Sequence, residues 1–133
     1  MSKRSVFISY SSSDTEMAAR VQSALENLGL KVVNPARELW AGADWRNQLQ
    51  SAIKRSDAMI ALASAPQSLS SSWTSYEVGM AEALGKRVIL LLPDKYPVTE
   101  LPADFASTQV VDFDPQAPER AAQDIASRLA LTM

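Results

Sequence analysis

Short apolar runs alternate along this chain with stretches in which apolar residues recur every three or four positions. A short apolar run is typical of a buried β-strand, and the longer spacing is typical of a helix with one face in a core. The predicted strands are 6–8, 30–33, 57–63, 87–92 and 109–113. The predicted helices are 14–28, 44–55, 71–84 and 118–129. This alternation indicates an α/β protein.

The predicted helices carry end signals as well as an apolar face. Ser13 or Asp14 is expected to cap the first helix, with Ser13 and Glu16 forming a capping box, and Gly29 ends it. Pro118 suits the first turn of the last helix. The expected inward-facing residues are Met17, Val21, Ala24, Leu25 and Leu28 in the first helix, Trp45, Leu49, Ala52 and Ile53 in the second, and Ala121, Ala122, Ile125, Ala126 and Leu129 in the last.

Strands that alternate with helices form parallel βαβ units with right-handed crossovers. Five of them favour a flavodoxin-like, three-layer fold, with a five-stranded parallel sheet of order 2-1-3-4-5 and helices on both faces. Ligands bind such a sheet outside the carboxyl ends of strands one and three, where the winding reverses. We therefore expect the loops 9–14 and 64–72 to border the binding site.

The helix 71–84 contains one charged residue on an otherwise apolar or aromatic face. That residue is Glu77, and a carboxylate on an inward face loses hydration, so it requires a partner or a task. Thr74 and Glu77 also fit a capping box, which gives Glu77 a purely structural role. The placement of Glu77 after the loop 64–72, at the predicted cleft, favours a functional role. The residues on or beside this face are Trp73, Tyr76, Glu77, Met80, Ala83 and Leu84.

Composition excludes several kinds of site. The chain contains no cysteine and no histidine, so disulfides, thiolate nucleophiles, Cys/His metal sites and Ser-His-Asp triads are ruled out. A net charge of -2 gives no basic surface for nucleic acid or an anionic membrane. The length of 133 residues suits one domain, 1–133. A signal-peptide core is missing and the run 88–92 is too short to cross a bilayer, so a cytoplasmic location is expected.

Two common functions of this fold are also excluded. A phosphorylated receiver domain has acidic residues after strand one and an aspartate at the end of strand three. This chain instead has Ser-Tyr-Ser-Ser-Ser at 9–13 and Ala-Leu-Ala-Ser at 61–64. A glycine-rich nucleotide-binding sequence, G-x-G-x-x-G or Walker, follows none of the predicted strands.

Four fragments resemble a known family. Residues 6–14, VFISYS-x-x-D, resemble the opening of a TIR (Toll/interleukin-1 receptor) domain. Residues 39–45, L-x-x-G-x-x-W, and 52–57, AI-x-x-SD, are similar to its long loop, second helix and third strand. Residues 71–77, S-x-W-x-x-x-E, are similar to the W-x-x-x-E signature of its enzymatically active members. The fragments occur in order and at the family's spacing over residues 5 to about 92, and the similarity beyond is weak.

The resemblance implies an activity and a way of assembling. Bacterial and plant-type TIR domains cleave the nicotinamide–ribose bond of NAD, and the family's catalytic glutamate corresponds to Glu77. NAD+ is then a substrate, and the reaction needs no cofactor. In the family the long loop after strand two packs against a neighbouring copy, which implies self-assembly through residues 35–45, with 39–45 as the contact, in bacterial defence or signalling.

The end of the first strand supplies candidate residues for binding NAD. Phe7, Ser9 and Tyr10 are expected at the same cleft as Glu77. Ser9 and Tyr10 are candidate ligands of a ribose or a phosphate group, whereas Phe7 has an equally simple role in the core.

Three tryptophans and one arginine complete the set of candidate binding residues. Trp73, one turn before Glu77, either walls the pocket or packs in the core. Trp40 is the better candidate for stacking on a nicotinamide or adenine ring or for contacting a partner, because it has no periodic reason to be buried, whereas Trp45 also fits the inner face of its helix. Arg37 can meet a pyrophosphate or lie in solvent.

The chemistry implied is glycoside cleavage through an oxocarbenium-like transition state, which one carboxylate can stabilise. Two other functions stay open. A non-enzymatic TIR interaction module self-associates without cleaving NAD, and the inward placement of Glu77 argues against it. A nucleoside deoxyribosyltransferase shares the fold type and uses a glutamate on a sugar, but the Ser-Tyr-Ser opening and the W-x-x-x-E spacing argue against it.

Overall fold

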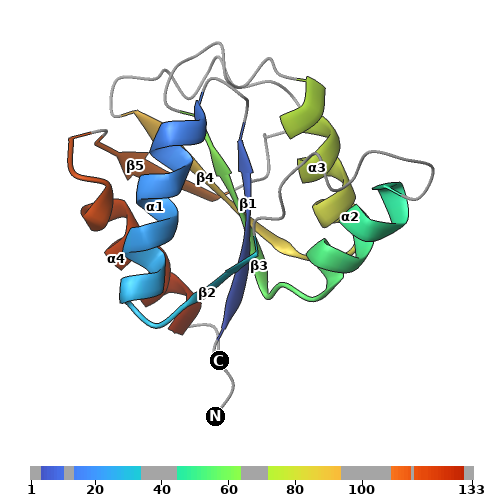
Figure 1. The fold of residues 1–133 in the computed structure, drawn as a ribbon, viewed down its shortest axis with the longest axis horizontal. Helices are drawn as coiled ribbons and strands as arrows, with labels where there is room; N and C mark the ends of the chain where they lie inside the picture. Colours follow the sequence, from blue (N-terminus) through green and yellow to red (C-terminus); the bar gives the residue numbers. More distant parts are fainter. Residues whose placement is uncertain are drawn as a thin grey trace.

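A parallel sheet forms the centre of the molecule, with helices packed on both of its faces (Figure 1). The computed structural model describes residues 4–10, 14–33, 45–63, 72–93, 109–114 and 116–130. Its strands are β1 (Ser5–Tyr10), β2 (Lys31–Val33), β3 (Ala58–Leu62), β4 (Arg87–Pro93) and β5 (Gln109–Phe113). Its helices are α1 (Thr15–Asn27), α2 (Trp45–Lys54), α3 (Ser72–Ala83) and α4 (Pro118–Ala130).

The strands follow the order β2-β1-β3-β4-β5, and each neighbouring pair is parallel. The predicted α/β class with a parallel sheet is therefore confirmed. The chain winds from β1 outward to β2 and then in the opposite direction through β3, β4 and β5. The helices that follow β1 and β3 consequently cover opposite faces, and the carboxyl ends of these two strands border the point of reversal.

The strict alternation of side chains along β1 divides the core into two halves. Val6 and Ile8 belong to an apolar cluster with α1 and α4, while Phe7 belongs to a second cluster with α2 and α3. We call these two sides of the sheet the α1/α4 face and the α2/α3 face. Because successive residues of a strand point to opposite sides, the position of Phe7 also assigns Ser9 to the α2/α3 face.

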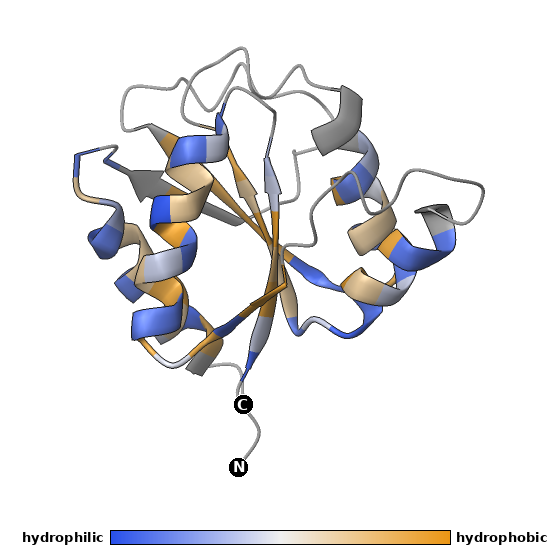
Figure 2. Cartoon of the chain, viewed as in Figure 1, coloured by the Kyte–Doolittle hydropathy of each residue, from blue (hydrophilic) through white to orange (hydrophobic). Residues whose placement is uncertain are grey.

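The distribution of hydropathy explains why the layers pack in this way. Figure 2 shows strongly hydrophobic central strands and helices whose hydrophilic residues lie mainly away from the sheet. Strand β3 is buried along its whole length, as expected for a parallel strand covered on both faces. The predicted inner residues of the second and last helices are confirmed at Leu49, Ala52 and Ile53 and at Ala121, Ala122, Ile125 and Leu129, all of which are buried.

Two glycines end helices as predicted. Gly29 has φ 90° and Gly85 has φ 73°, a left-handed conformation that glycine adopts without steric cost. After α3, the N–H of Lys86 donates to the carbonyl of Ala81 at 2.9 Å and the N–H of Gly85 donates to that of Glu82 at 3.0 Å. This pair of bonds is a Schellman motif, and the same pattern follows α1.

Three local predictions are wrong. Asp14 occupies the position before α1, but its side chain makes no capping hydrogen bond; it is instead buried, with 3% exposed. Leu28 is 45% exposed, because it lies at the helix end, where the backbone already turns toward Gly29. Strand β1 extends to Tyr10 rather than stopping at Ile8, since Ser9 and Tyr10 pair with Ala61 and Leu62 of β3.

Several predicted features lie outside the described residues: Ser13 and the capping box it was expected to form, the long loop 35–44, and the loop 64–71. Within the described part of the chain, no helix combines the length and the hydropathy needed to span a bilayer.

Candidate functional site

Ser9 lies near the carboxyl end of β1 with its side chain fully buried. It pairs in register with Ala61 of β3, and the alternation along β1 directs its side chain to the α2/α3 face. A hydroxyl at such a position loses its contact with water, so it requires a hydrogen-bond partner inside the protein.

That partner is Glu77 of α3. The Ser9 Oγ donates a hydrogen bond to the Glu77 Oε1 at 2.6 Å, which is at the short end of the range for O–H···O hydrogen bonds. Only 1% of Glu77 is exposed. The two residues are 68 positions apart in the sequence, and the sheet with its covering helix brings them together at the carboxyl end of β1.

The geometry of α3 argues against the capping-box role of Glu77. The helix begins at Ser72, so Thr74 lies inside the helix and not at its N-cap. A capping box requires the hydroxyl residue before the first helical residue and the glutamate in the first turn. Glu77 is further along the helix and faces the sheet, and the predicted capping box is therefore wrong.

The buried face of α3 is turned by about one residue from the predicted face. Val78 and Ala81 are buried beside Glu77, whereas Tyr76 is 40% exposed and Ala83 is exposed. The helix packs on the sheet through residues of small or compact volume, which permit a closer approach than a tyrosine ring.

In β1 and β3, side-chain volume on the α2/α3 face falls toward the carboxyl ends of the strands. The inner residues are Phe7 in β1 and Met59 in β3, and the next residues on this face are Ser9 and Ala61. Ala63, which follows β3, belongs to the same cluster. Ser9, the partner of Glu77, thus lies among small side chains at the carboxyl ends of β1 and β3.

Few polar groups are buried in the described part of the chain: Ser9, Asp14, Ser56 and Glu77. Ser56 donates from its Oγ to the carbonyl of Ala52 at 2.9 Å, a bond within its own segment. Asp14 precedes α1, which packs on the other face of the sheet. The Ser9–Glu77 pair is a buried polar contact that joins distant segments at the point of strand reversal.

The other predicted site residues are placed differently. Phe7 is 1% exposed and packs in the core of the α2/α3 face. Tyr10 is only partly buried and packs against the α1/α4 cluster, because it is one residue beyond Ser9 and points to the opposite side. The structure therefore brings Ser9 to Glu77 and directs Tyr10 away from that carboxylate.

The remaining predicted residues lie partly or wholly outside the described structure. Trp45 and Trp73 belong to α2 and α3, but only their place in these helices is described. Arg37 and Trp40 fall in the segment 34–44, outside the described residues. Their roles stay predictions.

The family sequence model of the TIR domain matches residues 6–129. The chain belongs to the TIR domain family, and the resemblance seen in the sequence is confirmed. Comparison with curated proteins gives no sequence match.

Solved structures with similar folds include two enzymes and one receptor. The CMP N-glycosidase BcmB of Clostridium botulinum is 24% identical, with a TM-score of 0.59 over 92% of this chain and 98% of that one. The 2-deoxyribosyltransferase of Bacillus psychrosaccharolyticus is 18% identical, with a TM-score of 0.65 over 86% and 90%. The metazoan TIR-STING receptor of C. gigas is 24% identical, with a TM-score of 0.66 over 89% of this chain and 38% of the receptor. At these identities the likeness establishes the fold.

Proposed function

We propose that this TIR domain cleaves the nicotinamide–ribose bond of NAD+, with Glu77 as the catalytic carboxylate. The observation that carries the proposal is the buried hydrogen bond between Ser9 and Glu77 at the carboxyl end of β1. A carboxylate held in a buried position, at the place where this fold binds ligands, is costly unless it has a function.

The proposed chemistry is a dissociative glycosidic cleavage. The bond between C1′ of the ribose and the nicotinamide nitrogen breaks, and its electron pair leaves with nicotinamide, which becomes neutral. The positive charge that remains on the ribose is stabilised by the Glu77 carboxylate. Water then adds at C1′ and loses a proton to give ADP-ribose, or a nitrogen of the adenine ring attacks to give a cyclic product.

Ser9 is assigned a positioning role in this reaction. Its hydroxyl is bound to the Glu77 Oε1 and so fixes the orientation of the carboxylate before the substrate arrives. A preorganised charge stabilises a transition state more effectively than one that has to reorient. The sequence suggested that Ser9 contacts a ribose or phosphate group directly. Its hydrogen bond to Glu77 instead supports the positioning role.

Two neighbours support chemistry on a sugar bond. One is named a CMP N-glycosidase and the other a 2-deoxyribosyltransferase. They also define the second candidate function, cleavage of the glycosidic bond in a nucleoside or nucleotide other than NAD+. The third candidate is a TIR interaction module without activity, for which Glu77 has a structural role only.

The test is incubation of the purified protein with NAD+, with products resolved by chromatography. Glu77→Gln keeps the shape of the side chain and removes its charge, and we expect NAD+ cleavage to fall about 100- to 1,000-fold. Glu82→Gln is the matched control, because Glu82 lies on the same helix with an exposed side chain, and it is expected to retain wild-type activity.

Each alternative predicts a different result. Cleavage of CMP or a deoxynucleoside, with NAD+ left intact, selects the second candidate. The interaction module is selected if NAD+, CMP and the deoxynucleoside all stay intact at every protein concentration and if Glu77→Gln self-associates as the wild type does. Full NAD+ cleavage by Glu77→Gln would contradict the proposed mechanism.

A further inference from the structure

We propose that a pocket beside the edge strand β2 binds a small oxyanion, a phosphate or carboxylate group, through Lys31 and Arg55. The pocket is separate from the Ser9–Glu77 site. Ser5, which lines the pocket, and Ser9 lie four residues apart on β1, a separation of about 13 Å along the strand. The two sites therefore lie toward opposite ends of β1.

The pocket exists because α2 does not cover the edge of the sheet. Helix α2 packs through Leu49 and Ile53 on the cluster that contains Phe7 and Met59, residues of β1 and β3. Strand β2 lies at the edge of the sheet, and the packing residues of α2 in the described part of the chain belong to the cluster over β1 and β3. The result is a cavity of about 270 Å³ lined by Ser5, Lys31, Val32, Val33 and Arg55.

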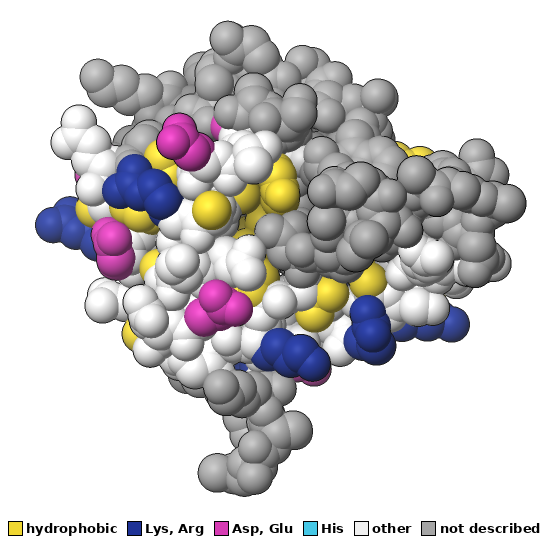
Figure 3. All heavy atoms as spheres, in the orientation of Figure 1, with side chains coloured by type: hydrophobic (Ala, Val, Ile, Leu, Met, Phe, Trp, Pro, Cys, Tyr) yellow, Lys and Arg dark blue, Asp and Glu magenta, His cyan; other side chains and the backbone are white. Residues whose placement is uncertain are grey.

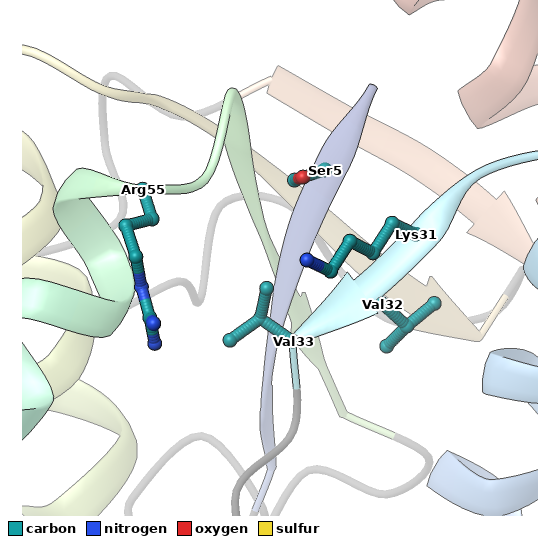
Figure 4. A pocket seen from close by; sticks show the side chains of 5 residues that line it. All are labelled: Ser5, Lys31, Val32, Val33 and Arg55. Carbon is teal, nitrogen blue, oxygen red and sulfur yellow. The ribbon is translucent and has the colours of Figure 1, made fainter. Parts of the chain in front are cut away.

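Figure 4 shows how two cations from different elements reach this cavity. Arg55 enters from the end of α2 and Lys31 from β2, with Val33 between them. Ser5 pairs in register with Lys31, so its side chain lies on the same side of the sheet. The space-filling view shows hydrophobic atoms at the surface between Lys and Arg side chains over this region (Figure 3).

The lining side chains offer hydrogen-bond donors and almost no acceptors. The ammonium of Lys31 and the guanidinium of Arg55 only donate, and the two valines do neither. The hydroxyl of Ser5 can donate as well. Among the described residues, the side chains of Lys31 and Arg55 make no hydrogen bond and no ion pair. The hydrogen bonds of Ser5 are made by its backbone N–H and carbonyl groups. Such a set of groups is complementary to an anion.

The charges around the pocket also favour binding of an anion. The whole chain has a net charge of -2, so two cations on one small cavity are not a consequence of a basic protein. They repel each other, and an anion between them removes that repulsion. One carboxylate, that of Asp57, contacts a residue that lines the pocket. Its Oδ2 accepts from the Ser5 N–H at 2.7 Å, and it pairs with neither cation.

The size and walls of the cavity limit the ligand. At about 270 Å³ it is at the small end of ligand pockets, and this size fits an oxyanion with a small organic part. Arginine binds phosphate and carboxylate groups by paired donors. The side chain of Val33 supplies an apolar wall on the same face of the sheet, while that of Val32 packs on the opposite face.

The test is titration of the ¹⁵N-labelled protein with inorganic phosphate and, separately, with acetate, at low ionic strength. We expect saturable amide shifts at Ser5, along β2 and at Arg55. Lys31→Ala and Arg55→Ala should each weaken binding about tenfold, the value of one charge-assisted hydrogen bond. Lys54→Ala is the matched control, because Lys54 precedes Arg55, is exposed and does not line the cavity.

The two anions distinguish the source of the ligand group. Tighter binding of phosphate assigns the pocket to a phosphorylated ligand, and tighter binding of acetate assigns it to a carboxylate. Absence of saturable shifts with both anions would overturn the proposal. An equal loss of affinity in Lys54→Ala would overturn it too, since that result indicates general surface charge.

Discussion

At the residue scale, the Ser9–Glu77 hydrogen bond leads to two separate predictions, one for stability and one for activity. Ser9→Ala removes the donor at 2.6 Å from the buried carboxylate, and we expect it to lower the free energy of unfolding by about 1–3 kcal/mol. If Glu77 acts as proposed, the loss of orientation lowers kcat for NAD+ cleavage about 10- to 100-fold and leaves KM nearly unchanged. Urea unfolding and steady-state kinetics measure the two effects.

Ser56→Ala is the control for this prediction, because it also removes a buried serine hydroxyl, here bound to the carbonyl of Ala52. It should lower stability and leave kcat unchanged. A double-mutant cycle of Ser9→Ala and Glu77→Gln should show a coupling of about 1–2 kcal/mol in stability. Additive effects in the cycle would show that the hydrogen bond is not formed in solution, and equal kcat values for Ser9→Ala and the wild type would remove its positioning role.

Sequence and structure agree on Glu77 and differ on its surroundings. Glu77 could be found in the sequence because it is the one charged residue on an apolar helical face. Its contact with Ser9 could not, because the partners are 68 residues apart and the sequence prediction assigned Ser9 to a ligand. Tyr10 was assigned with Ser9 to the same cleft, but the strand continues through both residues and turns their side chains to opposite faces.

At the scale of the element, Gly79 inside α3 and Gly85 just after its end lead to opposite predicted changes in stability. Gly85 has φ 73°, so Gly85→Ala should lower the free energy of unfolding by about 1–2 kcal/mol. Gly79 lies inside the helix, is exposed, and a Cβ built on it meets nothing within 4 Å. Gly79→Ala should raise the free energy of unfolding by roughly 0.5–1 kcal/mol. Urea unfolding of both variants checks the signs.

These two variants test the bounds and end of α3. A stabilising Gly85→Ala would contradict the left-handed turn that ends the helix. A destabilising Gly79→Ala would mean that this position is packed against another part of the protein. The rotation of α3 was not predictable, because Tyr76 counts as apolar in a periodic pattern and only the fit to the sheet shows that Val78 and Ala81 are the inner residues.

At the scale of the whole molecule, the self-assembly implied by the TIR resemblance predicts how activity depends on protein concentration. In the assembly that the TIR resemblance implies, residues 35–45 are expected to pack against a neighbouring copy, so we expect NAD+ cleavage per mole of protein to rise with protein concentration. Trp40→Ala should weaken both self-association and cleavage, while Trp40→Phe, which keeps an aromatic ring, should retain more of each. Light scattering and product analysis over the same concentrations measure them together.

A constant specific activity over these concentrations would contradict the need for assembly. Unchanged association in Trp40→Ala would separate this residue from the contact. Both results leave the Glu77→Gln experiment unaffected, since that experiment asks whether the carboxylate acts and not how copies of the domain are arranged.

The sequence by itself determined the α/β class, the approximate place of each helix and strand, the family, and the inward carboxylate of α3, Glu77. These follow from local signals, namely apolar periodicity, helix-ending glycines and short motifs, which need no knowledge of distant contacts. Only the tertiary structure decided the partner of Glu77, the inner face of α3, the burial of Asp14 and the open pocket at β2. Each of these depends on the register of strands and the distance between packed layers, and such quantities are set by residues far apart in the chain.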